Sequence, residues 1–287
     1  MGIVAGLMFA GAAPSFAATP ERCFGEGDTL VLRTVTVLQD TFSDITDFTA
    51  DPLGNVYVLT EQEVIEKYDA SGKKRTRFSQ NRFGAASGIL AGNALKLLVW
   101  YPDFRTALFL DRNLTQLGGA LNLIDAGYPE VCTIGLSADG NIWLYDEVAF
   151  KLKKISPEGV PFVESQQLNS LFNGRLNFQQ IMDDGVHVVG MDSVLGFFVF
   201  DVFGQFQRQI GIDAPVQQFF LENGALRWID THRHLHTLKV DIPGSASEWV
   251  FPKDVTTGQK IKLVPGGVLV DRNGVLVRAN ASKVGRI

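Results

Sequence analysis

A tight turn followed by an alternating strand recurs along the 287-residue chain at nearly regular intervals. The unit is clearest as DPLGNVYVL from residue 51, SADGNIWLY from 137 and DRNGVLVRA from 271, with weaker copies between them. Repetition at such a period is typical of folds in which neighbouring units together bury faces that no unit buries alone. The turn glycines lie 38 to 50 residues apart, about 44 on average, at Gly54, Gly92, Gly140, Gly185, Gly224 and Gly274.

A second turn follows the first by 15 to 19 residues in each full unit, and Asp or Ser opens it. The side chains of Asp and Ser accept hydrogen bonds from backbone N–H groups two residues further on, which fixes such turns. Two turns per unit predict four short strands, which we place at 45–50, 55–60, 63–69 and 74–79 in the first unit. The second turns begin at Asp69, Asp111, Ser156, Asp201 and Asp241.

Four strands in about 44 residues are typical of a β-propeller blade. The last unit ends before a fourth strand, whereas an additional strand, residues 29–38, precedes the first unit. We therefore predict an all-β, six-bladed β-propeller whose N-terminal strand becomes the outermost strand of the last blade and closes the ring. The alternatives are a seventh blade, with further strands inside 160–180, and a different all-β fold.

The paired turns resemble those of the NHL-like group of six-bladed propellers in secreted bacterial proteins, over residues 29–287. Residues 81–114 are similar to uncharacterised envelope propellers of Gram-negative bacteria. Many propellers share the turn motif, and the units at Gly92, Gly185 and Gly224 lack its complete form. The resemblance implies a subunit attached to an outer-membrane assembly or transport complex.

The first residues have the pattern of an export signal. An uncharged apolar run precedes Ser15-Phe16-Ala17, whose small residues suit signal peptidase, although no Lys or Arg precedes the run. We predict a signal peptide at 1–18, a link at 19–28 and one propeller domain at 29–287, in a protein that is periplasmic or outer-membrane-associated. A start upstream, an uncleaved anchor and an ordered first strand are the alternatives. Cys23 and Cys132 fall on opposite sides of the predicted ring, so we expect two unpaired thiols.

Charge and motifs narrow the function. The net charge is −5 and no long basic run is present, so nucleic acid is not an expected partner. The sequence holds no GxSxG, HExxH or CxxC motif, so we assign no catalytic residue and no organic cofactor. A metal ion is the one cofactor that the sequence leaves open.

The metal candidates lie in DTHRHLHTLKV, which begins at Asp230. Histidines two residues apart share one face of a strand, and imidazole suits zinc and copper. Since three such histidines spread along the strand, we expect two of them, His232 and His234, to bind an ion with Asp230. The alternative is a polar strand face that binds no metal, and His236 would belong to it.

Aromatic residues in expected loops are the candidate partner-binding residues, because Tyr, Phe and Arg are common anchors of interfaces. The alternative is that these residues cap the ends of the blades. They are Phe83, Tyr101, Phe104, Arg105 and Tyr128.

These features favour a non-catalytic propeller that acts as an interaction subunit or scaffold for other envelope proteins, such as an outer-membrane β-barrel complex. The alternatives are a metal-dependent lactonase, lyase or hydrolase that uses the central channel, and a glycan-binding module. Polar side chains around an ion in the channel would favour an enzyme. The candidates are Asp44, Asp47, Gln179, Gln180, Gln217 and Gln218, and GGVLVDRN at 266–273 is the expected innermost strand of the last blade.

Overall fold

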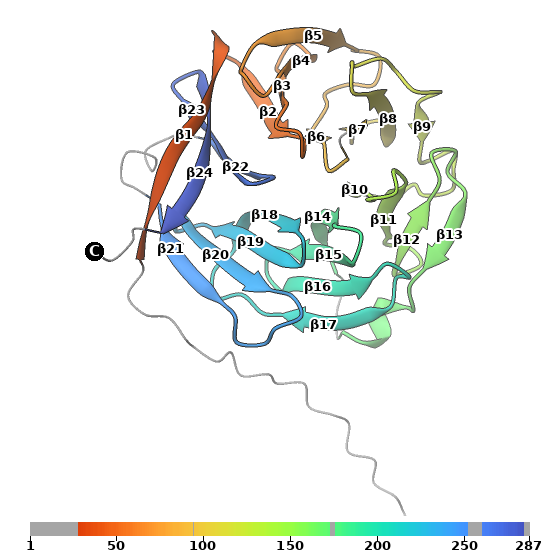
Figure 1. Ribbon diagram of the computed structural model, residues 1–287. Coiled ribbons are helices and arrows are strands. Elements are labelled where there is room, and N and C mark those ends of the chain that lie inside the picture. Colours follow the sequence, from red (N-terminus) through yellow and green to blue (C-terminus); the bar gives the residue numbers. More distant parts are fainter. Residues whose placement is uncertain (1–27, 94, 173–175, 252–259, 284–287) are drawn as a thin grey trace, which may run out of the picture.

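A ring of six blades surrounds a central channel in the computed structural model, which describes residues 28–93, 95–172, 176–251 and 260–283 (Figure 1). Each blade is a four-stranded antiparallel sheet whose first strand is nearest the axis. The predicted fold class and blade number are therefore confirmed. No described helix is long and apolar enough to cross a membrane. The predicted signal peptide and Cys23 lie outside the described residues.

The first blade has β2 (Ile45–Ala50), β3 (Val56–Thr60), β4 (Val64–Tyr68) and β5 (Lys74–Ser79). The second has β6 (Gly88–Leu90), β7 (Lys96–Tyr101), β8 (Thr106–Asp111) and β9 (Leu121–Asn122). The third has β10 (Ile134–Leu136), β11 (Ile142–Asp146), β12 (Lys151–Ile155) and β13 (Pro161–Glu164), followed by the short 3₁₀ helix η1 (Leu168–Ser170). The fourth has β14 (Phe178–Asp183), β15 (His187–Asp192), β16 (Gly196–Asp201) and β17 (Phe206–Ile210). The fifth has β18 (Val216–Glu222), β19 (Ala225–Asp230), β20 (His234–Lys239) and β21 (Ser247–Val250). The sixth has β22 (Ile261–Val264), β23 (Gly267–Arg272), β24 (Val275–Lys283) and β1 (Asp28–Thr41).

The turns form as their sequence predicts. In the first blade, Asp51 accepts hydrogen bonds at Oδ1 from the amides of Leu53 and Asn55, both at 2.9 Å. At the second turn, Asp69 accepts from the amides of Ser71 and Lys73. The four strands of this blade consequently begin and end within one residue of the predicted limits.

The N-terminal strand closes the ring. β1 pairs antiparallel with β24 from Leu30 opposite Lys283 to Thr41 opposite Val275, so it is the outermost strand of the sixth blade as predicted. Its first residues also pair in parallel with β21, which joins the fifth and sixth blades in one continuous sheet (Figure 1). The two ends of the described chain thus lie side by side.

One detail of the sixth blade corrects the sequence analysis. The innermost strand is β22, and the segment 266–273 that was expected there supplies β23, the second strand. The turn at Gly274 therefore joins the second and third strands, and the turn at Gly266 joins the first and second. Gly266 lies 42 residues after Gly224, which fits the average spacing better than Gly274 does.

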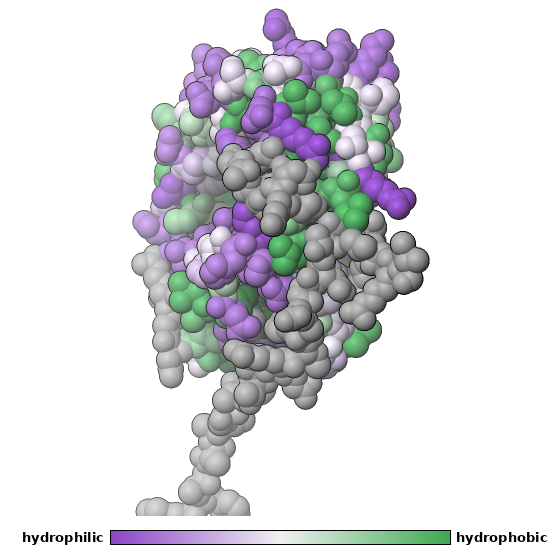
Figure 2. Space-filling view, turned by 90° about the vertical axis from the view of Figure 1, so that its left-hand side faces the viewer, coloured by the Kyte–Doolittle hydropathy of each residue, from purple (hydrophilic) through white to green (hydrophobic). Residues whose placement is uncertain are grey.

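The core is divided among the gaps between adjacent blades, where apolar side chains from facing sheets form six clusters. The outer strand shows how one face of a sheet is committed to this packing: Thr36 and Leu38 of β1 are buried, whereas Val35 and Val37 point outward. Alternation of this kind is expected where a strand is covered on one face. On the side where β1 lies, hydrophobic and hydrophilic residues are interspersed (Figure 2).

Candidate functional site

The innermost strands of all six blades line the central channel, a cavity of about 640 Å³. Five of the six predicted polar residues line it, and Asp44 does not: Asp47, Gln179, Gln180, Gln217 and Gln218. Apolar side chains such as Ile89, Ile181 and Phe219 lie between them. The channel is therefore partly polar, and the hydrogen bonds of these residues decide what the polarity does.

Three of the polar residues link neighbouring blades. Asp47, Gln180 and Gln218 each follow a β-bulge in the innermost strand, and a bulge re-aims the side chain beside it. Asp47 Oδ2 accepts from the amide of Ile89 in the second blade at 3.0 Å. Gln180 bonds to the backbone of Phe219, and Gln218 to the backbone of Leu263 and Ile261, each in the next blade.

Other polar groups of the channel are also paired with the scaffold. Lys262 Nζ lies 2.5 Å from Asp47 Oδ1, which connects the sixth blade to the first. Asp183 accepts from Ser137 Oγ at 2.6 Å and from Trp143 Nε1 at 2.7 Å, across the gap between the third and fourth blades. The polar residues of the channel thus form bonds that hold the blades together, which leaves them poorly disposed for binding an ion.

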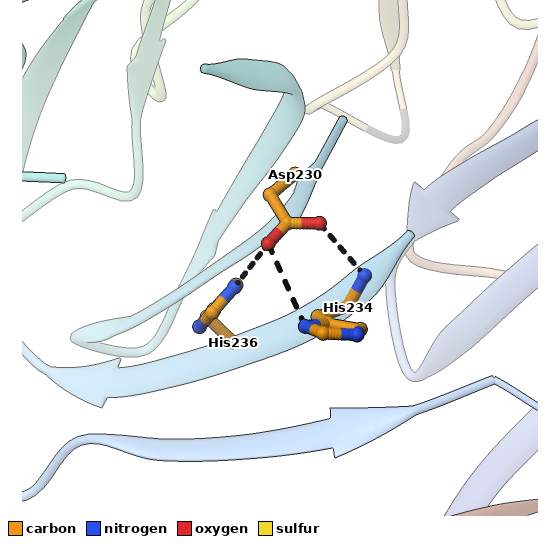
Figure 3. A group of neighbouring side chains, drawn as sticks. All are labelled: Asp230, His234 and His236. Atoms are coloured by element: carbon orange, nitrogen blue, oxygen red, sulfur yellow. Dashed lines mark hydrogen bonds and ion pairs between the residues drawn. The ribbon is translucent and has the colours of Figure 1, made fainter. Parts of the chain in front are cut away.

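A second polar cluster lies on the fifth blade, away from the axis. Asp230 at the end of β19 faces His234 and His236 of β20, and the three side chains present one ligand atom each within 4.8 Å of one another (Figure 3). Asp230 Oδ2 is 3.0 Å from His236 Nε2 and 3.8 Å from His234 Nδ1. Glu248 of β21 approaches from the other side, with Oε1 2.6 Å from His234 Nδ1.

The structure brings two of the three predicted metal ligands together and adds a different third. His232 lies in the turn before β20, its side chain is 70% exposed, and its Nδ1 is 4.0 Å from Asp230 Oδ2. Arg233 has a positive φ of 64°, which ends the alternation, so His232 leaves the strand face that His234 and His236 share. The pairing of His236 with Trp228 across β19 and β20 could have been inferred only from the strand register.

Electrostatics keep the central carboxylate ionised. Burial alone would raise the pKa of Asp230, but hydrogen bonds from His236 and from the amide of His234 hold that pKa below its ordinary value. Asp230 Oδ1 accepts from the His234 amide at 2.8 Å, so one oxygen is fixed by the backbone while Oδ2 faces the imidazoles. A charged, oriented oxygen beside two imidazole nitrogens is a donor set suited to a divalent metal.

The predicted partner-binding residues divide into buried and exposed groups. Tyr101 and Tyr128 are buried, and Phe83 is partly buried with its ring 5.6 Å from that of Tyr101. These three help to pack the ends of the blades. Phe104 is exposed, and Arg105 beside it donates to the carbonyls of Pro102 and Pro129, which fixes the loop.

Phe104 belongs to a larger exposed set. Connections between the second and third strands share one face of the ring with the links between blades, because successive strands run in opposite directions. On this face, the loops of the second, third and fourth blades expose large apolar side chains, which we call the apolar rim: Phe104, Ile124, Val148, Leu171, Val194 and Leu195. On the opposite face, exposed apolar residues are more widely separated, at Leu53, Leu95, Val160, Val186, Phe203 and Ile242.

Comparison with known proteins supports the fold. No protein-family model matches the chain, and no curated protein matches it in sequence. Among solved structures, a streptogramin B lyase is similar with a TM-score of 0.55 and 12% sequence identity, over 89% of this chain and 88% of that chain. Likeness at this identity shows the six-bladed β-propeller architecture and leaves activity open.

Proposed function

We propose that this chain is a non-catalytic propeller that binds another protein through the apolar rim. The observation that carries the proposal is the concentration of six exposed apolar side chains on the loops of three consecutive blades. Contiguous apolar exposure of this kind marks protein-binding surfaces, and loops held by a rigid scaffold are common carriers of binding residues.

The hydrogen bonds in the channel support the non-catalytic part of the proposal. A catalytic pocket needs polar groups that converge on a substrate, but Asp47, Gln180 and Gln218 point their polar atoms at the backbone of adjacent blades. Their chemistry is therefore committed to holding the ring together.

The sequence supports a setting for this function. The signal-like residues 1–18 favour export, and the resemblance to NHL-like propellers favours a scaffold in the Gram-negative envelope, in the periplasm or on an outer-membrane assembly. In this proposal, residues 29–287 are the mature binding domain and 19–28 a link. Cell fractionation tests the location: recovery of the protein with cytoplasmic markers would contradict export.

Site-specific photo-crosslinking tests the docking surface. A benzophenone amino acid placed at Phe104, Val148 or Val194 should capture the same partner, identified by mass spectrometry, and purified partner should reduce capture in a saturable way. Phe203 on the opposite face is the matched control, since it is also an exposed aromatic residue. Equal capture from Phe203, or different proteins captured from the three rim positions, would contradict the proposal.

A glycan-binding module has less support. Such modules stack sugars on exposed aromatic rings, but among the four predicted aromatic residues only Phe104 is exposed. Titration with cell-wall polysaccharides tests this alternative, and saturable binding that is lost in Phe104→Ala would favour it over protein docking.

An enzyme that uses the channel is the remaining alternative, and the fold likeness to a lyase favours it. In this interpretation Asp47 and Lys262, which are in contact, would face the substrate. Purified protein can be incubated with streptogramin B and with simple lactones, and product followed by mass spectrometry. Turnover that disappears in Asp47→Asn would favour the enzyme and contradict the non-catalytic proposal.

A further inference from the structure

We propose that the fifth blade carries a site for a divalent transition-metal ion, for which zinc is the best match, with Asp230, His234 and His236 as ligands. The site is separate from the apolar rim and from the channel bonds, so it does not depend on the proposed function. It differs from the set expected from sequence, in which His232 took the place of His236.

The strand register brings the ligands together. His234 and His236 are two residues apart on β20 and share a face. Asp230 ends the neighbouring strand, and the turn that follows, closed by the Arg233 amide on the Asp230 carbonyl at 3.0 Å, returns the chain beside it. Three donors therefore converge from a hairpin that is fixed by backbone hydrogen bonds.

The donors are held before any ion binds. The ring of His236 stacks on Trp228 with centroids 4.8 Å apart and an interplanar angle of 11°. The Asp230 carboxylate is fixed through its other oxygen by the His234 amide. Ligands whose rotamers are fixed by packing and by outer hydrogen bonds bind metal more tightly, because less conformational entropy is lost.

The spacing and chemistry favour zinc. Donors of a tetrahedral zinc site lie about 2.0–2.2 Å from the ion, which places them about 3.3–3.5 Å from one another. The observed separations of 3.0 and 3.8 Å from Asp230 to the two histidines bracket that value. Two imidazoles and one carboxylate suit zinc better than magnesium or calcium, which prefer all-oxygen sites.

Glu248 is the residue that adjusts the site. Its Oε1 is 2.6 Å from His234 Nδ1, the nitrogen that would bind the ion, so this hydrogen bond must break when zinc binds. The freed carboxylate then lies beside the ion, where it can take the fourth position or leave it to water. Loss of an outer partner typically changes metal affinity by about 10–100-fold, and Glu248→Gln should weaken binding within that range if the carboxylate assists.

Zinc titration of chelator-treated protein, purified without a polyhistidine tag, tests the site. We expect one ion per chain with a dissociation constant of about 1 μM or tighter, as preformed zinc sites achieve. His236→Phe keeps an aromatic ring against Trp228 but removes the donor nitrogen, and it should abolish this binding. His232→Ala is the matched control and should leave binding unchanged, as should Cys132→Ser, which removes an exposed sulfur ligand.

Spectroscopy supplies an independent measurement. Cobalt substituted for zinc should give the intense visible absorption of a four-coordinate ion without a thiolate charge-transfer band, and copper should quench the fluorescence of Trp228. The quenching should fall in Trp228→Phe. Binding too weak to saturate at about 100 μM zinc, or binding lost in His232→Ala and retained in His236→Phe, would overturn the proposal. Circular dichroism of each variant separates loss of a ligand from loss of the fold.

Discussion

Asp47 and Lys262, 215 residues apart in the chain, form an ion pair of 2.5 Å that joins the first and last blades at the channel wall. The same carboxylate accepts from the amide of Ile89 in the second blade. One side chain thus connects three consecutive blades around the point where the ring closes. Because the pair is largely shielded from water, its two charges interact more strongly than an ion pair on the surface does.

Removal of one partner of this pair should destabilise the protein. Lys262→Met leaves the Asp47 carboxylate partly buried without its cation, and we expect the free energy of unfolding to fall by about 1–3 kcal/mol. Asp47→Asn should cost less, since its amide oxygen still accepts from Ile89. Urea denaturation measures both variants and the double variant. Lys151→Met, which removes a more exposed ion pair with Glu164, should change stability by about 0.5 kcal/mol or less. An equal loss in the two lysine variants would contradict a special role for ring closure.

Packing of the closing strand gives a second prediction. Leu38 of β1 is 5% exposed and packs with the first and sixth blades, whereas Val37 beside it is 50% exposed. Leu38→Ala should lower the free energy of unfolding by about 2–4 kcal/mol through the cavity it creates, and Val37→Ala by less than about 1 kcal/mol. Similar costs for both variants, measured by thermal or urea unfolding, would mean that β1 does not pack on the sixth blade through this face.

The first blade and the closing strand were predictable because each depends on local signals. The complete turn motif at Asp51 to Asn55 fixes the ends of its strands through the Asp side chain. The sixth blade was misassigned because Gly266 and Gly274 both have positive φ, 70° and 86°, and close equally tight turns. Local turn chemistry does not reveal which strands a turn connects, and only the pairing of β22 with β23 distinguishes them.

The candidate sites show the same division. Alternation correctly grouped His234 with Asp230, but the positive φ of Arg233, which takes His232 off the strand face, has no clear signal in a non-glycine residue. The polarity of Gln180 and Gln218 was visible in the sequence, and their commitment to adjacent blades was not. That commitment depends on bulges and on contacts between residues about 40 positions apart.

Stability should depend on pH through Asp146. Burial by itself would raise the pKa of Asp146, but the amides of Ala149 and Val148 and the ammonium of Lys153, 3.0 Å away, hold that pKa below its ordinary value. The unfolded chain therefore binds a proton at Asp146 before the folded chain does. Its contribution is complete above the unfolded pKa of 3.8 and is lost as pH falls through the lower folded value.

Asp146→Asn tests this linkage by urea denaturation over a series of pH values. The variant should be less stable than the parent protein by about 1–2 kcal/mol at pH 7, because the paired carboxylate is lost. The difference should shrink as the pH falls below about 4, since the parent carboxylate is then increasingly protonated. A difference that stays constant from neutral to acidic pH would show that the charge of Asp146 contributes nothing.

The turn at Gly274 should tolerate no side chain, because it lies against the segment that follows β1. Its φ is 86°, and an added Cβ would lie 2.1 Å from the carbonyl oxygen of Phe42. The Gly274 carbonyl also accepts from the Phe42 amide at 2.8 Å, so neither segment can withdraw without breaking this bond. Gly274→Ala should cost about 2–5 kcal/mol from left-handed strain and overpacking together. Gly118→Ala is the control: φ is 69° there but no atom lies within 4 Å of the added Cβ, so only the strain of about 1–2 kcal/mol remains. Equal losses in urea denaturation would show that backbone conformation alone matters, and that the contact between Phe42 and Gly274 does not constrain the closure of the ring.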